Sequence, residues 1–152
     1  MGGRDRPRIK GLAKATRGAR LVVTPHQSLS REGEEWLFTH AEILSEGGPR
    51  DGDGAYYGST MITIDLEALS EHWRGSFDAT ERARLAQAVE GSVRVRLRAM
   101  RLAVREAQRR LADRRFGRAS VETRVRLVGL KLHVDVDVEL PFDVSSGGSV
   151  SR

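Results

Sequence analysis

The clearest pattern of apolar and polar positions lies between Asp78 and Gly117. Apolar residues recur there in steps of four and three, as they do on one face of a helix with 3.6 residues per turn. They are Leu85, Val89, Val93, Leu97, Met100, Val104, Ala107 and Leu111. The pattern predicts one amphipathic helix whose apolar stripe faces a core.

Residues that favour helix ends lie at both limits of this segment. Asp78 precedes the first turn and Glu81 follows three residues later, which is the spacing of a capping box. Arg114 and Arg115 would lie where the helix dipole favours cations, and Gly117 can adopt the left-handed conformation that ends helices. The helix is therefore expected to span the whole segment.

A break at Gly91 is the alternative to a continuous helix. Glycine costs roughly 1 kcal/mol relative to alanine in the middle of a helix, and Val93–Leu97 also alternates like a strand. The continuous helix is favoured, and at 1.5 Å per residue it would be ~55 Å long. A compact domain of this chain length has a radius of gyration near ~15 Å. The helix would therefore overhang its own domain and need a second copy or another protein to cover it.

Arginines flank the apolar stripe. On a heptad, Arg94 and Arg101 take e positions, whereas Arg96 and Arg110 take g positions. Two copies paired along this stripe would set arginine against arginine, so self-coiling is disfavoured. We expect the stripe to pack on a sheet instead.

Beyond Gly117 the apolar positions alternate with polar ones, as in strands. Folding this segment at Gly129–Leu130 predicts a hairpin in which four cross-strand pairs form one apolar or threonine face. The pairs are Leu127 with Leu132, Val125 with Val134, Thr123 with Val136, and Val121 with Val138. A one-residue slip would bring charges into the core. The alternative is one long strand with a bulge at Val128–Gly129, which keeps the same faces.

Apolar runs before the helix predict further strands. Leu21–Thr24 is a β-branched run stopped by Pro25, as in an edge strand. Trp36–Leu44 is interpreted as a strand, although its glutamates and alanine would also suit a helix. Tyr56–Leu66 is interpreted as the strand that pairs with it.

Two connecting segments complete the prediction. Residues 45–55 are rich in Gly, Pro and Asp, and they are expected to form a long loop between the two strands. Asp65–Arg74 is expected to form a short helix that Gly75 ends. This helix would deliver the chain to the start of the long one.

Together these elements predict an α+β fold. A small antiparallel sheet, made of the C-terminal hairpin and the N-terminal strands, packs on one long amphipathic, Arg-rich helix. With 152 residues, of which 39% are hydrophobic, the chain can bury one modest core. We expect a single domain over residues 20–141, a flexible basic arm over 1–19 and a flexible Ser/Gly tail over 142–152.

Composition narrows the function classes. The chain has no cysteine, which excludes disulfides, thiol nucleophiles and thiolate zinc sites. No run approaches the ~20 apolar residues of a membrane span, and the first residues lack the apolar core of a secretory signal. A soluble, cytoplasmic protein without membrane partners is expected.

Charge is divided unevenly along the chain. The formal net charge is +5, which permits an anionic partner, although a GC-rich coding sequence also enriches arginine. Residues 91–118 hold ten arginines and two acids, whereas residues 31–71 hold ten acids, Arg31 and Arg50. These two regions can neutralise each other within one fold or between copies.

Candidate sites for chemistry are weak. Asp51–Gly54 resembles the opening of a calcium loop, but an EF-hand needs a ligand at position five, Gly at six and Glu at twelve, and these positions hold Ala55, Tyr56 and Ile62. A second candidate is a row of possible metal ligands that alternate onto one strand face, although a solvated charged face explains it better. The row is His133, Asp135 and Asp137. The sequence therefore predicts no catalytic, cofactor-binding or metal-binding residues and no small-molecule substrate.

Two hypotheses follow from these patterns. The first is a non-enzymatic assembly or scaffold subunit that forms a homo-oligomer or docks into a larger complex through its long helix and its acidic surface. The acidic residues are Glu34, Glu35, Glu42, Asp51 and Asp53. The alternative is a nucleic-acid-binding module whose basic arm and arginine stripe contact phosphates. The stripe is Arg94, Arg98, Arg101, Arg105 and Arg109.

Overall fold

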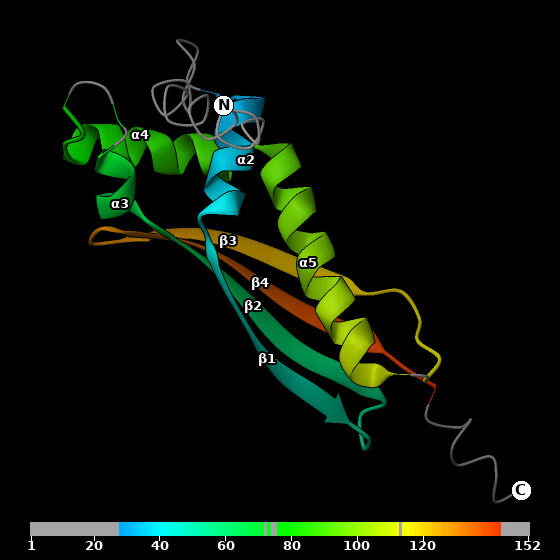
Figure 1. The fold of residues 1–152 in the computed structure, drawn as a ribbon. Helices are drawn as coiled ribbons and strands as arrows, with labels where there is room; N and C mark the ends of the chain where they lie inside the picture. Colours follow the sequence, from blue (N-terminus) through cyan, green and yellow to red (C-terminus); the bar gives the residue numbers. More distant parts are fainter. Residues whose placement is uncertain (1–27, 72, 74–75, 113, 144–152) are drawn as a thin grey trace, which may run out of the picture.

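The computed structural model describes residues 28–71, 73, 76–112 and 114–143 of the chain. In these residues a four-stranded antiparallel sheet and helices form an α+β fold, which confirms the predicted class (Figure 1). The elements are α2 (Arg31–Thr39), β1 (Glu42–Arg50), β2 (Ala55–Asp65), α3 (Leu66–Ser70), α4 (Ala79–Glu90), α5 (Val93–Leu111), β3 (Ser120–Val128) and β4 (Lys131–Pro141).

The sheet has the strand order β1-β2-β4-β3, and every neighbouring pair is antiparallel. Helices α2, α4 and α5 lie on one face, with α5 running along the strands (Figure 1). Among the described residues, no element covers the opposite face. Because β1 and β3 are the first and last strands in the order, they form the two edges of the sheet.

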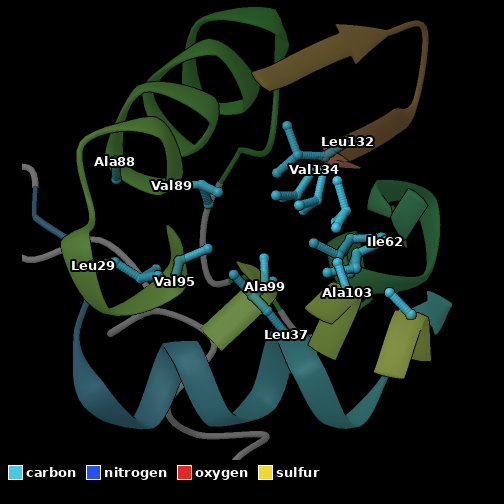
Figure 2. Close-up of a cluster of buried hydrophobic side chains, with 14 of the residues drawn as sticks. Leu29, Leu37, Ile62, Ala88, Val89, Val95, Ala99, Ala103, Leu132 and Val134 are labelled. Carbon is cyan, nitrogen blue, oxygen red and sulfur yellow. The ribbon is translucent and has the colours of Figure 1, made fainter. Parts of the chain in front are cut away.

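The core lies between the helices and the sheet. Alternate residues of the central strand β4 are buried, as expected for a strand with one face against a core. They are Leu132, Val134, Val136, Val138 and Leu140. Small residues at every fourth position of α5 lie against them, so the helix backbone comes close to the sheet. Figure 2 shows Ala99 and Ala103 of α5 in one cluster with Leu37 of α2 and Ile62 of β2.

The prediction of one continuous helix is correct only in part. The helical segment breaks at Gly91–Ser92, where the extended Ser92 accepts a hydrogen bond from the Val95 N–H and caps α5. The first predicted cap is confirmed, because the Asp78 carboxylate accepts from the Glu81 N–H. The break was the alternative prediction, and it separates a helix that contacts β3 from one that crosses to β1.

The break also changes which residues face the core. Val93 and Leu97, predicted in the apolar stripe, are 60% and 44% exposed. The buried residues of α5 are Val95, Ala99, Ala103, Ala107 and Leu111. The prediction of an overhanging helix is wrong as well, because α5 has 19 residues, about 28 Å at 1.5 Å per residue, and lies along the sheet (Figure 1).

The helix ends six residues before the predicted stop at Gly117. Ala112 has a φ of 58°, a conformation that does not continue a helix. The chain beyond it pairs with the end of β4: the Gly117 N–H donates to the Pro141 carbonyl, and Phe116 bridges to Phe142. Phe116 and Gly117, which mark the predicted end of the helix, therefore pair with the end of β4 instead.

The predicted strand over Trp36–Leu44 is wrong for its first half. Arg31–Thr39 forms a helix, because Ser30 caps it by accepting from the Gly33 N–H and two acids lie in its first turn. Trp36 and Leu37 are buried on its inner face. The strand begins only at Glu42.

The predicted long loop over 45–55 is also wrong, since β1 continues to Arg50 and the turn is only Asp51–Gly54. Gly47 has a φ of 146° and pairs with Gly58. A Cβ on Gly47 would lie 2.5 Å from the Gly58 Cα. The two glycines therefore permit a close approach of two strands rather than a loop.

The C-terminal hairpin has the predicted register. Val121, Thr123, Val125 and Leu127 pair with the residues of β4 expected from the alternation, and the turn lies at Gly129–Leu130. The alternative of one long bulged strand is excluded. The strand predicted over Tyr56–Leu66 is found as β2. The short helix predicted over Asp65–Arg74 is found in part as α3, which ends at Ser70.

Several predictions fall outside the described residues. They concern the strand over Leu21–Thr24, the basic arm over 1–19, the helix end at Gly75 and most of the tail over 142–152. Within that tail, Phe142 is buried and the Asp143 N–H donates to the Arg115 carbonyl.

The break between α4 and α5 provides a test of the capping argument. Ser92→Ala removes the hydroxyl that accepts from the Val95 N–H, so the free energy of unfolding should fall by about 1 kcal/mol. Urea unfolding followed by circular dichroism measures this change. Thr80→Ala, in the exposed first turn of α4, is the control and should change stability by less than about 0.5 kcal/mol. Equal losses in the two variants would contradict the cap.

Candidate functional site

The predicted arginine stripe lies on the face of α5 that points away from the sheet. Arg94, Arg101, Arg105 and Arg109 are exposed and Arg98 is half-buried. The helix places them together because they recur at intervals of three and four residues. Their partners decide whether this face is free to bind another molecule.

Glu34 of α2 neutralises one end of the stripe. Its side chain is only 9% exposed and accepts from the Arg94 Nε at 2.8 Å and from the Arg98 Nη1 at 3.4 Å. Arg98 also reaches Glu35 at 3.0 Å and lies over the Phe38 ring, 4.3 Å from its centroid. These ion pairs join α2 to α5 within one chain.

Of the other predicted acidic residues, one forms an ion pair within the chain and two face solvent. Asp51 accepts from Arg114 at 2.9 Å, and Arg114 also covers the Phe142 ring. Glu42 and Asp53 are exposed and form no ion pair with any residue that the structure describes. The acidic region is therefore not one continuous surface, because its best-placed members already bind arginines.

Arg101 and Arg105 are the members of the stripe that remain unpaired among the described residues. They lie one helical turn apart on the exposed face. The fifth member, Arg109, binds Glu106 three residues before it. The free positive charge of the stripe is thus concentrated at two adjacent arginines.

Glu106 and Arg110 form a site that sequence analysis missed. The Glu106 carboxylate accepts from Arg109 and from the Arg110 Nε at 2.8 Å. Hydrogen bonds from Arg109 and then Arg110 lower the pKa of Glu106, and the hydrogen bond to Glu106 raises the pKa of Arg110. The four-residue spacing of Glu106 and Arg110 was the available indication.

Arg110 covers the edge strand β1. Its Nη2 donates to the Ser45 carbonyl at 2.9 Å and its Nη1 to the Gly47 carbonyl at 3.1 Å. The same guanidinium lies 3.5 Å from the Tyr56 hydroxyl. Pro49, two residues further along β1, has no N–H to offer a neighbouring strand. This edge of the sheet is therefore blocked over half of its length.

The other edge strand, β3, carries no such cover from the described residues. It is nine residues long, without glycine or proline. Large apolar side chains are exposed at and next to the hairpin turn: Leu127 at 37%, Val128 at 53% and Leu130 at 41%. An uncovered regular edge presents unpaired N–H and C=O groups that can bind another strand.

The uncovered face of the sheet is hollow and acidic. A cavity of about 780 Å³ extends across the four strands, and its lining includes four carboxylates. They are Glu46, Glu122, Asp137 and Glu139. None of them forms an ion pair with a described residue, so solvent or an external partner must balance their charge.

The row of His133, Asp135 and Asp137, considered in the sequence as possible metal ligands, does not form a ligand set. The His133 Nδ1 lies 3.0 Å from the Thr63 hydroxyl, and Asp135 binds Arg126. In the part of the chain that the structure describes, no group of three His, Asp or Glu side chains could hold a metal ion. The row is an ordinary polar outer face of β4.

Comparison of the chain with protein-family models, curated proteins and solved structures finds no match. No helix among the described residues is long and apolar enough to cross a membrane.

The buried end of the arginine stripe leads to a first test. Glu34→Gln leaves Arg94 and Arg98 without their shared carboxylate, so the free energy of unfolding should fall by about 1–3 kcal/mol. Glu35→Gln is the matched control; Glu35 is 64% exposed, and its loss should cost less than about 1 kcal/mol. Urea unfolding of both variants measures the difference, and equal effects would contradict a structural role for Glu34.

The lowered pKa of Glu106 leads to a second test. A carboxylate whose pKa is lower in the folded chain stabilises the fold above its ordinary pKa of about 4.3, and this contribution is lost as the pH falls through the folded value. Wild type should therefore exceed Glu106→Gln in stability at neutral pH, and the difference should shrink below about pH 4. Thermal unfolding across pH measures it. A difference that does not depend on pH would contradict the assignment.

Proposed function

We propose that this chain is a non-enzymatic assembly subunit that docks onto another protein chain through its exposed edge strand β3. The observation that carries the proposal is the contrast between the two sheet edges. Arg110 and Pro49 block β1 over half of its length, whereas β3 is regular along its whole length, uncovered by described residues and apolar near its turn. Native proteins protect long regular edges unless the edge has a partner.

The docking surface differs from the one that the sequence suggested. The arginine helix was expected to mediate assembly, but Glu34, Glu35 and Glu106 engage three of the five arginines within the chain. The helix also lies along its own sheet and needs no second copy to cover it (Figure 1). Pairing along the edge of β3 would provide a docking surface that does not involve the arginines of α5.

Nucleic-acid binding is the second candidate. Arg101 and Arg105 support it, because they are exposed and have no carboxylate partner among the described residues. Two arginines one turn apart can contact phosphates but carry no base-reading groups. Such binding would be weak, insensitive to nucleic-acid sequence and strongly dependent on salt.

Light scattering at several protein concentrations tests the first candidate. The mass of one chain is 16.9 kDa. We expect a larger mass that rises with concentration and persists at high salt, because edge pairing rests on backbone hydrogen bonds and apolar contact. Purified chain that stays at 16.9 kDa throughout would contradict self-assembly, and would leave docking onto another protein to be sought by capture from a lysate.

The same measurement with a short DNA or RNA duplex separates the second candidate. A complex that forms at low salt, dissociates at high salt and is lost in Arg101→Glu with Arg105→Glu would favour nucleic-acid binding. Glu42→Arg adds a charge elsewhere and serves as the control. No complex at low ionic strength would exclude this candidate.

A further inference from the structure

We infer that the partner of β3 is the β3 strand of a second copy, paired antiparallel about a two-fold axis at Thr123. This inference rests on the proposed assembly function and specifies its partner. The two sheets would join into one eight-stranded sheet, with both helix layers on the same side. Four observations on β3 and its surroundings support a second copy of the chain as the partner.

The first observation is the direction of the backbone groups. In antiparallel pairing, residues alternate between those that bond to the neighbouring strand and those whose N–H and C=O point away. Val128 and Lys131 flank the two-residue turn and form the bonded pair that closes it. The alternate residues Leu127, Val125, Thr123 and Val121 therefore direct their backbone groups to the edge of β3 that no described strand covers.

The second observation is charge complementarity, which favours one register among those with an axis between Glu122 and Val125. Pairing must match odd residues with odd ones, because a one-residue shift would mix the apolar and polar faces. An axis at Glu122 would oppose two glutamates, an axis at Arg124 two arginines, and an axis at Val125 would set Arg124 against Arg126. An axis at Thr123 sets Glu122 of each copy opposite Arg124 of the other. The edge thus complements itself in this register.

The ion pairs of the two arginines of β3 agree with an axis at Thr123. Arg126 is engaged by Asp135 within its own chain. Arg124 is 61% exposed and lies 3.9 Å from Asp135, at the limit of an ion pair. Arg124 is therefore the arginine that is available to a second copy. On the other face, Val121 would lie opposite Val125 of the partner strand.

The third observation concerns the ends of the edge. The same register brings the turn of one copy to the start of β3 in the other. Leu130, 41% exposed, would then meet the partner segment around Phe116, which is 40% exposed. Leu127 would lie opposite Ala119, which directly precedes β3 in the second copy. Apolar side chains that face water in one chain would cover one another in the pair.

The fourth observation is the space above the middle of β3. A cavity of about 220 Å³ lies between the helix layer and this part of the strand. Its lining includes Glu90, Arg96, Thr123 and Val125. The helix layer therefore does not fill the space above the inferred axis.

Charge reversal tests the register by sedimentation velocity on the full chain. Glu122→Arg and Arg124→Glu each convert two opposite-charge pairs into two like-charge pairs, so each should raise the dimer dissociation constant about tenfold. The variant carrying both changes restores the pairs and should return close to the wild-type value. Glu42→Arg, on the opposite edge strand, is the control and should leave the dimer unchanged.

The outcomes separate this inference from the proposed function. A wild-type oligomer that ignores both single reversals, or a double variant that stays as weak as the singles, would overturn the β3 register and leave assembly intact. A wild-type chain that is monomeric at every concentration would overturn self-pairing altogether, and β3 would then have to bind an extended segment of another protein or no partner.

Hydrogen exchange on the wild-type chain gives a second readout that does not depend on folded variants. Amides of Val121, Thr123 and Val125 should exchange at least about tenfold more slowly at a concentration above the dissociation constant than below it. Amides of β1 should show no such change. Slowing in β1 rather than in β3 would overturn the inference.

Discussion

The burial of one face of β4 is the constraint on which the rest of the structure depends. Leu132, Val134 and Val136 lie under the helix layer, and each is at most 2% exposed. Because side chains alternate along a strand, this burial determines the register of both neighbouring strands. It also directs the charged residues of β4 to the face that no described element covers, where Asp137 and Glu139 line the acidic cavity. The alternation of side chains along β4 thus explains both the packing of the core and the position of the charged residues on the opposite face.

Opposite charges that are distant in the sequence meet within the fold. Glu34 lies 60 residues before Arg94, and their ion pair holds α2 against α5. Glu106 and Arg110 connect α5 to the edge strand β1 through the Ser45 and Gly47 carbonyls. The charge polarity of the chain therefore stabilises contacts between its own elements. What the described residues leave for a partner is the edge of β3, the two arginines Arg101 and Arg105, and the acidic sheet face.

The candidate site was only partly predictable. Helical spacing correctly grouped the arginines of α5 on one outer face, and strand alternation correctly paired Thr123 with Val136 across the hairpin. Neither pattern could show that Glu34 engages Arg94, because two side chains 60 residues apart meet only through packing. The role of Arg110 was missed for the same reason, since its acceptors on β1 lie on a segment whose composition predicted a loop.

The sequence alone correctly predicted the elements whose pattern is local: the faces and pairing of the C-terminal hairpin, the strand β2, the cap at Asp78 and the α+β class. Each follows from a period of residues or from a side chain that bonds to its own neighbours. Where two periodic patterns compete, tertiary structure decided between them. At Gly91–Ser92 the helix breaks into α4 and α5, because capping by Ser92 and contact of the two helices with different parts of the sheet outweigh the continuity of one helix. It also decided that β2 lies next to β4 and leaves β3 at the edge. Strand order depends on which buried faces fit together, and no local pattern encodes it.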